Sequence, residues 1–332
     1  MLHVSIIGLG MAVEPHALSL MDLAQEVDVR WAASPSATRT AAFAARYPFA
    51  VTNDVDAAIA DPKVDAVLLL TPPNTHLEFA RKIFDHGKHL LIEKPLDVTL
   101  ERAQAIVDAA GAADRRLGVV LQHRFRPGAE RLSELLQQDA LGTVQAATLN
   151  VPWWRPQSYY DEPGRGTLTR DGGGVLMTQA IHSLDLFRAL LGPVAVEAAM
   201  ARTTALHKME TEDLVMALLR LGNGAPANLL ATTASYPGHP EEISVIGTLG
   251  SARLTGGALE MRWLDGRRED VAASTASGAT GNAMNFPHDA HKALITDFCQ
   301  AIAEGRAPRT SGREALATQK LIVDLLGKTK RD

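Results

Sequence analysis

The strongest constraint on the fold is the pattern of the first ~120 residues, in which short apolar runs alternate with longer amphipathic stretches. The apolar runs are strand candidates at residues 4–7, 27–32, 64–70, 89–92 and 117–121. Helical patterns at 15–23, 37–46, 75–85 and 100–113 separate them. The run at 64–70 is almost purely apolar, which is typical of a central parallel strand covered on both faces. The pattern therefore predicts a doubly wound parallel sheet with right-handed crossovers.

The character of the chain changes after Gln122. Turn signals such as Gly222-Asn223-Gly224 separate strand-like runs from residue 194 to about residue 264, which predicts a mostly antiparallel sheet. We further expect helices at 127–138, 172–191, 288–304 and 314–326, a strand at 144–151, an aromatic loop at 152–163 and a mobile loop at 272–285. The expected division is an α/β domain over residues 1–122 and an α+β domain over residues 123–332, with an open-faced sheet in the second.

Composition limits the partners of this chain. Its 332 residues carry a net charge of −5 and no long basic run, which argues against nucleic acid or an anionic membrane as partner. The single cysteine, Cys299, excludes an internal disulfide and fits a reducing compartment. The N-terminus has no signal-like segment, and no apolar stretch reaches the ~18–20 residues of a membrane helix. We therefore expect a cytoplasmic protein that binds a small molecule.

Two glycines mark a candidate nucleotide site. Gly8-Leu9-Gly10 follows the first strand and precedes a helix. Gly8 would form a tight turn, and Gly10 would let a pyrophosphate approach the backbone and the N–H groups of the helix N-terminus. Val13 replaces the third glycine of the usual Rossmann pattern. Two glycines are a weak signature, but their place at the first strand–helix junction favours a dinucleotide site.

The end of the second strand bears on the choice of nucleotide. An acid at that position binds the ribose hydroxyls of NAD, but the sequence here reads Ala32-Ala33-Ser34-Pro35-Ser36. Ser34, Ser36 and Arg39 could instead receive a 2′-phosphate. The alternative is that Arg39 is a solvated helix residue. The sequence favours NADP weakly and leaves NAD open.

Two further segments are more specific. The first comprises Thr71-Pro72-Pro73-Asn74-Thr75-His76 and Glu93-Lys94-Pro95, and the second Gly172-Gly173-Gly174 followed by His182 and Asp185. Together they closely resemble the glucose–fructose oxidoreductase, inositol dehydrogenase and MocA family, over essentially the whole chain. The resemblance implies an NAD(P)-dependent oxidoreductase with a Rossmann domain. The cofactor would contact Gly8, Gly10, Met11, Ser34, Arg39, Thr71, Pro72, Asn74, His76, Glu93, Lys94 and Gln122.

Lys94 and His182 are the candidate catalytic residues. Lys94 follows a buried parallel strand, at the edge of the sheet where ligands of open α/β sheets bind, and Glu93 can orient it. Pro95 stiffens this turn, and the resemblance allows a cis bond before it. His182 is suited to proton transfer because its ordinary pKa is ~6.5. Lys94 would stabilise a developing alkoxide while His182 removes the hydroxyl proton, although these two roles could be exchanged.

The residue four before His182 departs from the family pattern. On one helix, Thr178 and His182 would face the same way. Similar family members commonly carry an Asp at the position of Thr178, so a carboxylate–histidine pair is in doubt here. Thr178 can hydrogen-bond but cannot balance an imidazolium charge.

Aromatic and cationic residues suggest where a substrate binds. Trp154, Tyr160 and Arg165 precede the triple glycine and suit a hydroxylated ring or a carboxylated substrate; the alternative is a structural lid or an oligomer contact. We also expect Thr178 and His288 at the substrate. His288 and His291 with Asp289 lack further ligands at metal spacing, so no metal is expected.

The sequence thus predicts an oxidoreductase for a sugar, cyclitol or related hydroxylated compound. Two alternatives remain: glycoside hydrolysis by transient oxidation with bound NAD, and a nicotinamide-binding regulator without catalysis. Because helices are scarce between residues 194 and 264, one face of the second sheet is expected to be covered in a homodimer or homotetramer.

Overall fold

The chain folds into two compact units. The computed structural model describes residues 1–273 and 287–329, so most of the loop expected at 272–285 lies outside the described residues. The first unit comprises Met1–Leu121 and His288–Leu316, and the second Gln122–Pro287 and Ala317–Asp332. The chain leaves the first unit beside the boundary expected at residue 122. The helix that follows His288 was expected in the second domain but belongs to the first unit.

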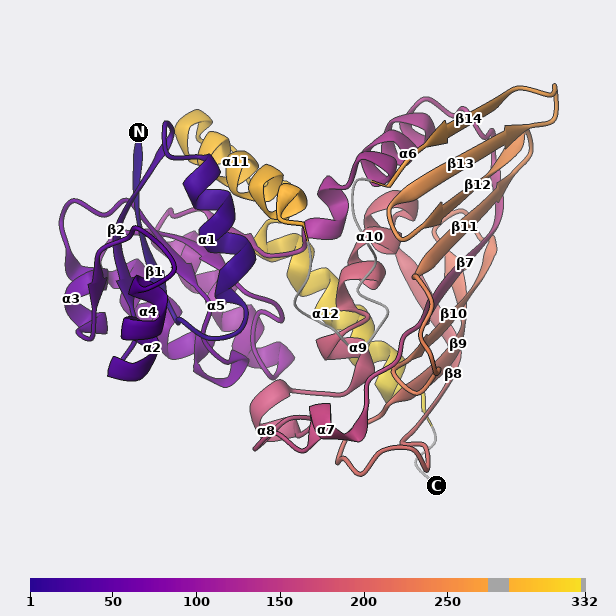
Figure 1. Cartoon of the computed structure of the whole chain (residues 1–332). Coiled ribbons are helices and arrows are strands. Elements are labelled where there is room, and N and C mark those ends of the chain that lie inside the picture. The colour runs from indigo at the N-terminus through magenta and orange to yellow at the C-terminus, as the bar shows by residue number, and fades with distance from the viewer. Residues whose placement is uncertain (274–286, 330–332) are drawn as a thin grey trace. The chain divides into compact units, whose positions relative to one another are not determined.

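The first unit is built on a six-stranded sheet in the order β3-β2-β1-β4-β5-β6. Strands β1 and β2 of this sheet are labelled in Figure 1. Every pair of neighbouring strands is parallel. This confirms the predicted doubly wound sheet. The strands are β1 (Leu2–Ile7), β2 (Val27–Ala33), β3 (Val51–Thr52), β4 (Ala66–Leu69), β5 (His89–Ile92) and β6 (Leu117–Val119). Helices α1 (Val13–Asp22), α2 (Ala37–Ala44), α3 (Val55–Ala60), α4 (His76–Asp85), α5 (Leu100–Ala112) and α11 (Asp289–Glu304), with the 3-10 turn η1 (Pro73–Thr75), complete the unit.

The strand order of this sheet locates a ligand site. The connections run outward in opposite directions from the neighbouring strands β1 and β4. In open α/β sheets, ligands bind outside the carboxyl ends of the strands at such a switch point. All four residues of β4 are buried, as expected for a strand covered on both faces. Side chains after β1, β4 and β5 are therefore the first places to look for chemistry.

The second unit contains an eight-stranded sheet in the order β14-β13-β12-β11-β7-β10-β9-β8. It is mostly antiparallel, as predicted, but β7 pairs in parallel with β10. The strands are β7 (Val144–Pro152), β8 (Val194–Arg202), β9 (Leu214–Leu221), β10 (Pro226–Thr232), β11 (Glu242–Gly247), β12 (Gly250–Thr255), β13 (Ala258–Trp263) and β14 (Arg268–Val271). The helices are η2 (Gln122–Phe125), α6 (Pro127–Gln137), α7 (Gln157–Tyr160), α8 (Leu168–Asp171), α9 (Val175–Thr178) and α10 (Ile181–Leu191). Helix α12 (Gly312–Gly327) begins in the first unit and belongs to the second from Ala317 onward.

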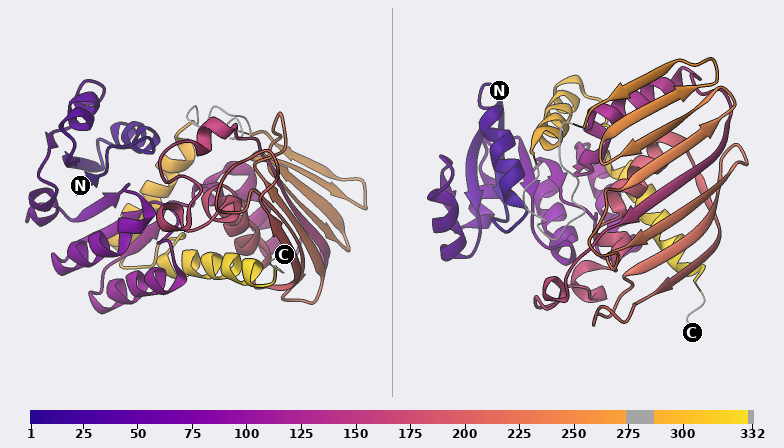
Figure 2. Two further views of the ribbon diagram at one scale, coloured as in Figure 1. Left: turned by 90° about the horizontal axis from the view of Figure 1, so that it is seen from below. Right: turned by 45° about the vertical axis from the view of Figure 1, so that its right-hand side comes forward.

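Helices cover one face of this sheet. Helices α6, α9 and α10 pack against its strands, and Figure 2 shows the opposite face without a helix among the described residues. The strands alternate accordingly, so that in β9 Val215, Ala217 and Leu219 are buried while Met216 and Leu218 are exposed. The core of the unit lies between the covered face and the helices.

Among the described residues, every helix is too short or too polar to span a membrane.

The single helix predicted over residues 172–191 is wrong. The triple glycine is not helical, and α9 and α10 are separated by a turn at Gln179 and Ala180. A Cβ on Gly174 would lie 1.9 Å from the backbone oxygen of Glu212, so this glycine allows the chain to cross the segment before β9. The carboxylate of Glu212 accepts the backbone N–H of Gly174 at 3.2 Å. Burial raises the pKa of Glu212, and the backbone N–H groups that donate to this carboxylate lower its pKa by less.

A buried ion pair joins three elements of the second unit. Arg124 of η2 donates two hydrogen bonds of 2.6 Å to the carboxylate of Asp185 in α10. Thr318 of α12 donates to the same carboxylate at 2.9 Å. Asp185 is fully buried, so its charge depends on these partners. The pair fixes α10, the helix that carries His182.

Candidate active site

The turn between β1 and α1 has the shape expected of a nucleotide-binding turn. Gly8 has φ +103°, and a Cβ there would lie 2.7 Å from the backbone carbon of Leu70, so only glycine fits. A Cβ on Gly10 would meet no atom within 4 Å, which leaves its backbone open to a ligand. No side chain caps the N-terminus of α1, and Met11 is exposed. The positive end of the helix dipole suits an anion.

The end of β2 presents fewer ligand groups than expected. Ser34 is buried, and its hydroxyl accepts the backbone N–H of Ser36. The Ser36 hydroxyl accepts the N–H of Arg39 and so caps α2. The side chain of Arg39 is exposed. Arg39 is therefore the group here that can reach a ligand phosphate, while Ser34 shapes the turn.

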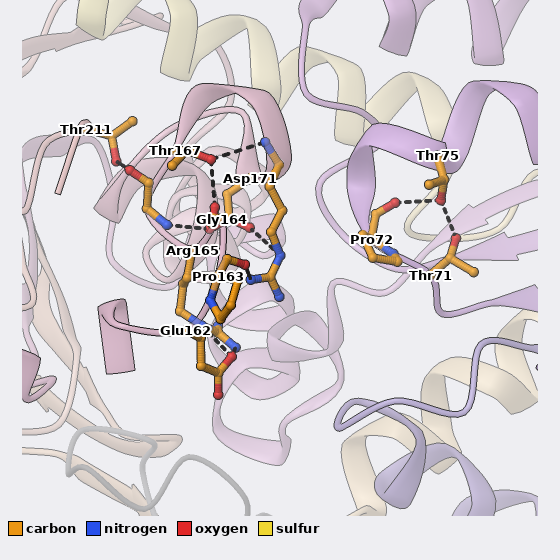
Figure 3. Close-up of polar contacts among 12 residues, drawn as sticks. Thr71, Pro72, Thr75, Glu162, Pro163, Gly164, Arg165, Thr167, Asp171 and Thr211 are labelled. Carbon is orange, nitrogen blue, oxygen red and sulfur yellow. Dashed lines mark hydrogen bonds and ion pairs between the residues drawn. The ribbon is translucent and has the colours of Figure 1, made fainter. Parts of the chain in front are cut away.

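The loop after β4 is held by its own threonines. The Thr75 hydroxyl donates to the carbonyl of Pro72 at 2.7 Å and lies 2.8 Å from the Thr71 hydroxyl (Figure 3). The Pro72 carbonyl can only accept, so the single proton of the Thr75 hydroxyl is donated to it. In the bond between the two hydroxyls, Thr71 is therefore the donor. Pro72 and Asn74 are exposed. This loop lies at the carboxyl end of β4, where the switch point places a ligand.

His76 has a different task from the one expected. It was predicted to contact the cofactor, but its side chain is fully buried. Its Nε2 lies 2.9 Å from the carbonyl of Thr71, and its Nδ1 lies 3.0 Å from that of Leu96. Burial lowers the pKa of His76, although these carbonyls oppose the shift. His76 thus joins the loop after β4 to the loop that contains Lys94.

Glu93 is held mainly by a residue that the sequence did not suggest. His16 of α1, fully buried, places its Nε2 2.9 Å from the Glu93 carboxylate, and the His291 ring stands edge-on to His16 at 5.2 Å. The other carboxylate oxygen accepts the backbone N–H of Lys94 at 3.1 Å. Burial by itself raises the pKa of Glu93, but the hydrogen bond from His16 and the charges of His16, Lys94 and His291 leave it below its usual range.

Lys94 stands in the turn that this carboxylate anchors. It follows β5 by two residues, and the peptide bond between Lys94 and Pro95 is cis. Glu93 was expected to orient Lys94, and the observed contact between them includes a hydrogen bond to the backbone of Lys94. One polar residue on the buried face of α1, His16, was the only sequence signal for this arrangement.

In the second unit, His182 lies near the start of α10 and stacks against His123 of η2. The two ring centroids are 5.0 Å apart and the planes differ by 28°. The prediction that Thr178 faces the same way on one helix is wrong, because Thr178 ends α9. Its hydroxyl donates to the carbonyl of Gly174 at 2.7 Å. His123 was missed because a lone histidine carries no periodic signal.

The aromatic loop is held in place by a second missed histidine. Both nitrogens of His207 are engaged, Nδ1 by Asp213 at 2.7 Å and Nε2 by the carbonyl of Arg155 at 2.8 Å. The rings of Trp154 and Tyr160 pack on His207. The hydroxyl of Tyr160 bonds to Thr233 at 2.6 Å, and burial raises its pKa. Tyr160 is thus a core residue, whereas Trp154 is half-buried.

Arg165 keeps its charge at the edge of this loop. Its guanidinium lies 4.2 Å from the centre of the Tyr159 ring and donates to the Tyr159 hydroxyl at 2.7 Å. It also pairs with Glu162 (Figure 3). The carboxylate of Asp171 accepts the N–H of Gly166 at 2.7 Å and closes the same loop. Arg165 is part of a built turn that can present a cation to an anionic or hydroxylated ligand.

His288 and Gln122 complete the predicted set. His288 was expected to reach a substrate from the second domain, but it belongs to the first unit, where its Nε2 lies 3.1 Å from the carboxylate of Asp22. The side-chain oxygen of Gln122 is buried and has no hydrogen-bond partner among the described residues. Such an oxygen suits a ligand N–H. Within residues 1–273 and 287–329, no group of three or more His, Cys, Asp or Glu side chains could hold a metal ion.

Comparison with known proteins supports this description. Residues 2–121 match a family described as "Oxidoreductase family, NAD-binding Rossmann fold", and residues 129–253 match the GFO/IDH/MocA C-terminal domain. The scyllo-inositol 2-dehydrogenase (NAD+) of Bacillus subtilis is 25% identical over 77% of this chain and 73% of its own. A D-xylose 1-dehydrogenase (NADP+) of Haloferax volcanii is 25% identical over 80% and 78%. The WlbA dehydrogenase of Bordetella pertussis, solved with NADH and UDP-GlcNAcA, is 26% identical with a TM-score of 0.83, covering 98% and 96%.

The two glycines after β1 should differ in what they tolerate. Gly8→Ala introduces a clash with Leu70 and a strained φ, so we expect the free energy of unfolding to fall by about 1–3 kcal/mol. Gly10→Ala meets no protein atom, so stability should stay within about 0.5 kcal/mol. Its Cβ should weaken binding of a nicotinamide dinucleotide about tenfold or more, since that side of the backbone faces the ligand.

Melting curves and fluorescence titrations with NADH and NADPH measure the two effects separately. A Gly10→Ala protein that binds both dinucleotides normally, or that melts like Gly8→Ala, would contradict this assignment of the turn.

Proposed function

Because the chain belongs to the GFO/IDH/MocA family of NAD-binding oxidoreductases, we propose that it transfers a hydride between a nicotinamide and a secondary alcohol or ketone of a sugar or cyclitol. The observation that carries the proposal is the placement of Lys94. It follows β5, next to the switch-point strand β4, in a turn held by Glu93 and His76. A cation fixed at the carboxyl edge of a parallel sheet can stabilise an alkoxide there.

The residues after β1 fit a dinucleotide. Gly10 leaves room for a pyrophosphate, and no side chain caps the N-terminus of α1, where the helix dipole favours an anion. Thr71, Pro72 and Asn74 would border the cofactor along the loop after β4, and the free oxygen of Gln122 would accept an N–H from it. The bound nicotinamide supplies the hydride acceptor or donor, and the protein supplies orientation and proton handling.

Lys94 and His182 divide the proton chemistry in this proposal. During oxidation His182 removes the hydroxyl proton, and the Lys94 ammonium stabilises the negative charge that develops on that oxygen. In the reverse direction the His182 imidazolium returns the proton. Neither step requires a metal.

The substrate class follows from the relatives and from the aromatic loop. The relatives named above act on scyllo-inositol and D-xylose, both of which are polyhydroxylated. The half-buried face of Trp154 suits the C–H face of a sugar ring, and Arg165 suits a hydroxyl or carboxylate on it. The Thr178 hydroxyl, which donates to the carbonyl of Gly174, could still accept a hydrogen bond from a substrate hydroxyl.

Lys94→Ala and His182→Ala should each lower kcat by about 10²- to 10⁴-fold, because each removes a group that acts mainly in the transition state. The affinity for NAD(P)H should change less than about threefold. A screen of cyclitols and aldoses that follows absorbance of the reduced nicotinamide identifies a substrate for this comparison.

Lys63→Ala and His239→Ala are the matched controls, since both side chains are exposed and lie outside the proposed machinery. These controls should retain full kcat. Normal activity of a folded Lys94→Ala protein on an identified substrate would end this proposal.

For the cofactor, we propose that NADP(H) binds at least as tightly as NAD(H). No acid follows β2, and the guanidinium of Arg39 is exposed at the start of α2. Arg39→Ala should weaken NADP(H) binding about tenfold and leave NAD(H) binding nearly unchanged. The reason is that Arg39 would contact only the 2′-phosphate, which NAD(H) does not carry. Fluorescence titrations at one ionic strength measure both constants. A clear preference of the unmodified protein for NAD(H) would refute this assignment.

The uncovered face of the second sheet supports an oligomer. Met200, Met216 and Leu218 are 78%, 54% and 61% exposed, and they lie side by side because Met200 pairs with Met216 across β8 and β9. At the other end of the sheet the exposed residues include charged ones, among them Glu260 and Arg262 of β13. We propose that the apolar β8–β9 end of this face packs against a second copy of the chain.

Light scattering at micromolar concentration should therefore give at least twice the chain mass of 35.6 kDa. Leu218→Glu should shift the protein toward monomer, because it places a charge within the apolar contact. Ser251→Glu, on an exposed position of β12, is the control and should leave the mass unchanged. A monomer for the unmodified chain would contradict the proposal.

A further inference from the structure

The face of the His182 imidazole is covered by a second imidazole. His123 of η2 and His182 of α10 are only 3% and 8% exposed, and their rings stack at 5.0 Å between centroids. The elements η2 and α10, which carry these two rings, also pack against each other. Because both rings are buried, His182 cannot turn out of this plane without displacing its neighbour.

The protonation state of His123 follows from its partner. Arg126 places Nη2 2.7 Å from Nε2 of His123. A guanidinium has only donors and stays protonated, so Nε2 of His123 must be the acceptor and its proton must sit on Nδ1. A second proton on the ring would break this hydrogen bond and set an imidazolium beside a guanidinium. His123 is therefore a neutral ring in one tautomer.

Arg126 is itself fixed by buried groups. Its Nη1 donates to the carboxylate of Glu241 at 2.5 Å, and the other oxygen of Glu241 accepts the indole N–H of Trp153 at 3.2 Å. Arg126, Glu241 and Trp153 are all buried. A charge pair in this environment is strongly held, because breaking it would leave an unpaired buried charge. The chain of contacts from Trp153 to His123 thus sets the plane of the ring that meets His182.

We propose that His123 is a positioning residue for His182, an inference that rests on the catalytic role proposed above for His182. The neutral ring of His123 holds the His182 imidazole in one plane through both halves of the proton cycle, without adding a second charge when His182 is protonated.

The charged groups around α10 are compatible with this role. Neither β7 nor α9, which pack against α10, carries an ionisable side chain. Arg124 of η2 and Asp185 of α10 neutralise each other through two hydrogen bonds. The remaining ionisable residues on α10 and on the two other helices in contact with it, α6 and α12, are Arg188, Glu130, Arg131, Glu134, Arg313, Glu314, Lys320 and Asp324.

Two substitutions separate the ring from its hydrogen bond. His123→Ala removes the stacked ring, so kcat should fall about tenfold while the substrate KM and the cofactor affinity stay within about threefold. His123→Phe restores a flat ring without the acceptor and should recover most of the lost kcat. A His123→Ala protein with full kcat, or a His123→Phe protein no better than His123→Ala, would overturn the proposal.

An NMR titration tests the same inference without a measurement of activity, and its main observation is made on the unmodified protein. In the unmodified protein labelled with ¹⁵N-histidine, His123 should stay neutral with its proton on Nδ1 between pH ~5.5 and ~8.5, around the usual histidine pKa. Signals are assigned with His123→Phe and His182→Ala. His182 should show one predominant tautomer when neutral, and a mixture of tautomers in His123→Ala.

Titration of His123 within that range, or a proton on its Nε2, would overturn the inference. If His182→Ala remains active, the catalytic proposal fails. The NMR result still decides whether His123 orients His182.

Discussion

A charge that is removed from water has to be paired, and this requirement shapes both units around their candidate catalytic residues. In the first unit the buried His16 meets the carboxylate of Glu93, whose second oxygen anchors the backbone of Lys94. In the second unit Arg124 pairs with Asp185, three residues after His182. Loss of one member of such a pair typically costs about 3–5 kcal/mol, because the other member stays buried and uncompensated. The candidate catalytic side chains, Lys94 and His182, thus lie next to the buried charge pairs of their units.

The candidate ligand-contacting groups are built differently. Arg39 is exposed on α2, and the guanidinium of Arg165 rests on an aromatic face and pairs with a partly exposed carboxylate. An exposed charge such as that of Arg39 contributes little to stability, so it can change without unfolding the protein. This division allows one fold to keep its hydride chemistry while its cofactor preference and substrate vary. The mixture of NAD+ and NADP+ among the related dehydrogenases is in line with that separation.

The sequence predicts those features that local physics determines. The apolar run before Leu70 and the glycine at position 8 are sufficient to predict β4 and the nucleotide turn, because strand burial and backbone freedom are local properties. The mostly antiparallel second sheet follows from its turn residues. The two-residue strand β3 is too short to give a pattern.

The remaining features depend on contacts between residues far apart in the chain. Gly174 is excluded from a helix by the backbone of Glu212, which no pattern around the triple glycine reveals. His16, His123 and His207 were missed because each matters through a distant partner. Tyr160 resembled a ligand-binding aromatic residue in the sequence, but its hydroxyl bonds to Thr233 in the core. A buried polar network has no period, so a single sequence does not contain its signal.

The most direct measurement of the central claim is the transfer of deuterium from a labelled substrate to the nicotinamide. The protein would be incubated with NADP+ or NAD+ and a panel of cyclitols and aldoses deuterated at their carbinol carbons, and the reduced cofactor would be examined by mass spectrometry and NMR. The account predicts that one deuterium appears at C4 of the nicotinamide, on one face only, with at least one member of the panel. Absence of transfer across the panel by a protein that binds the cofactor would contradict it.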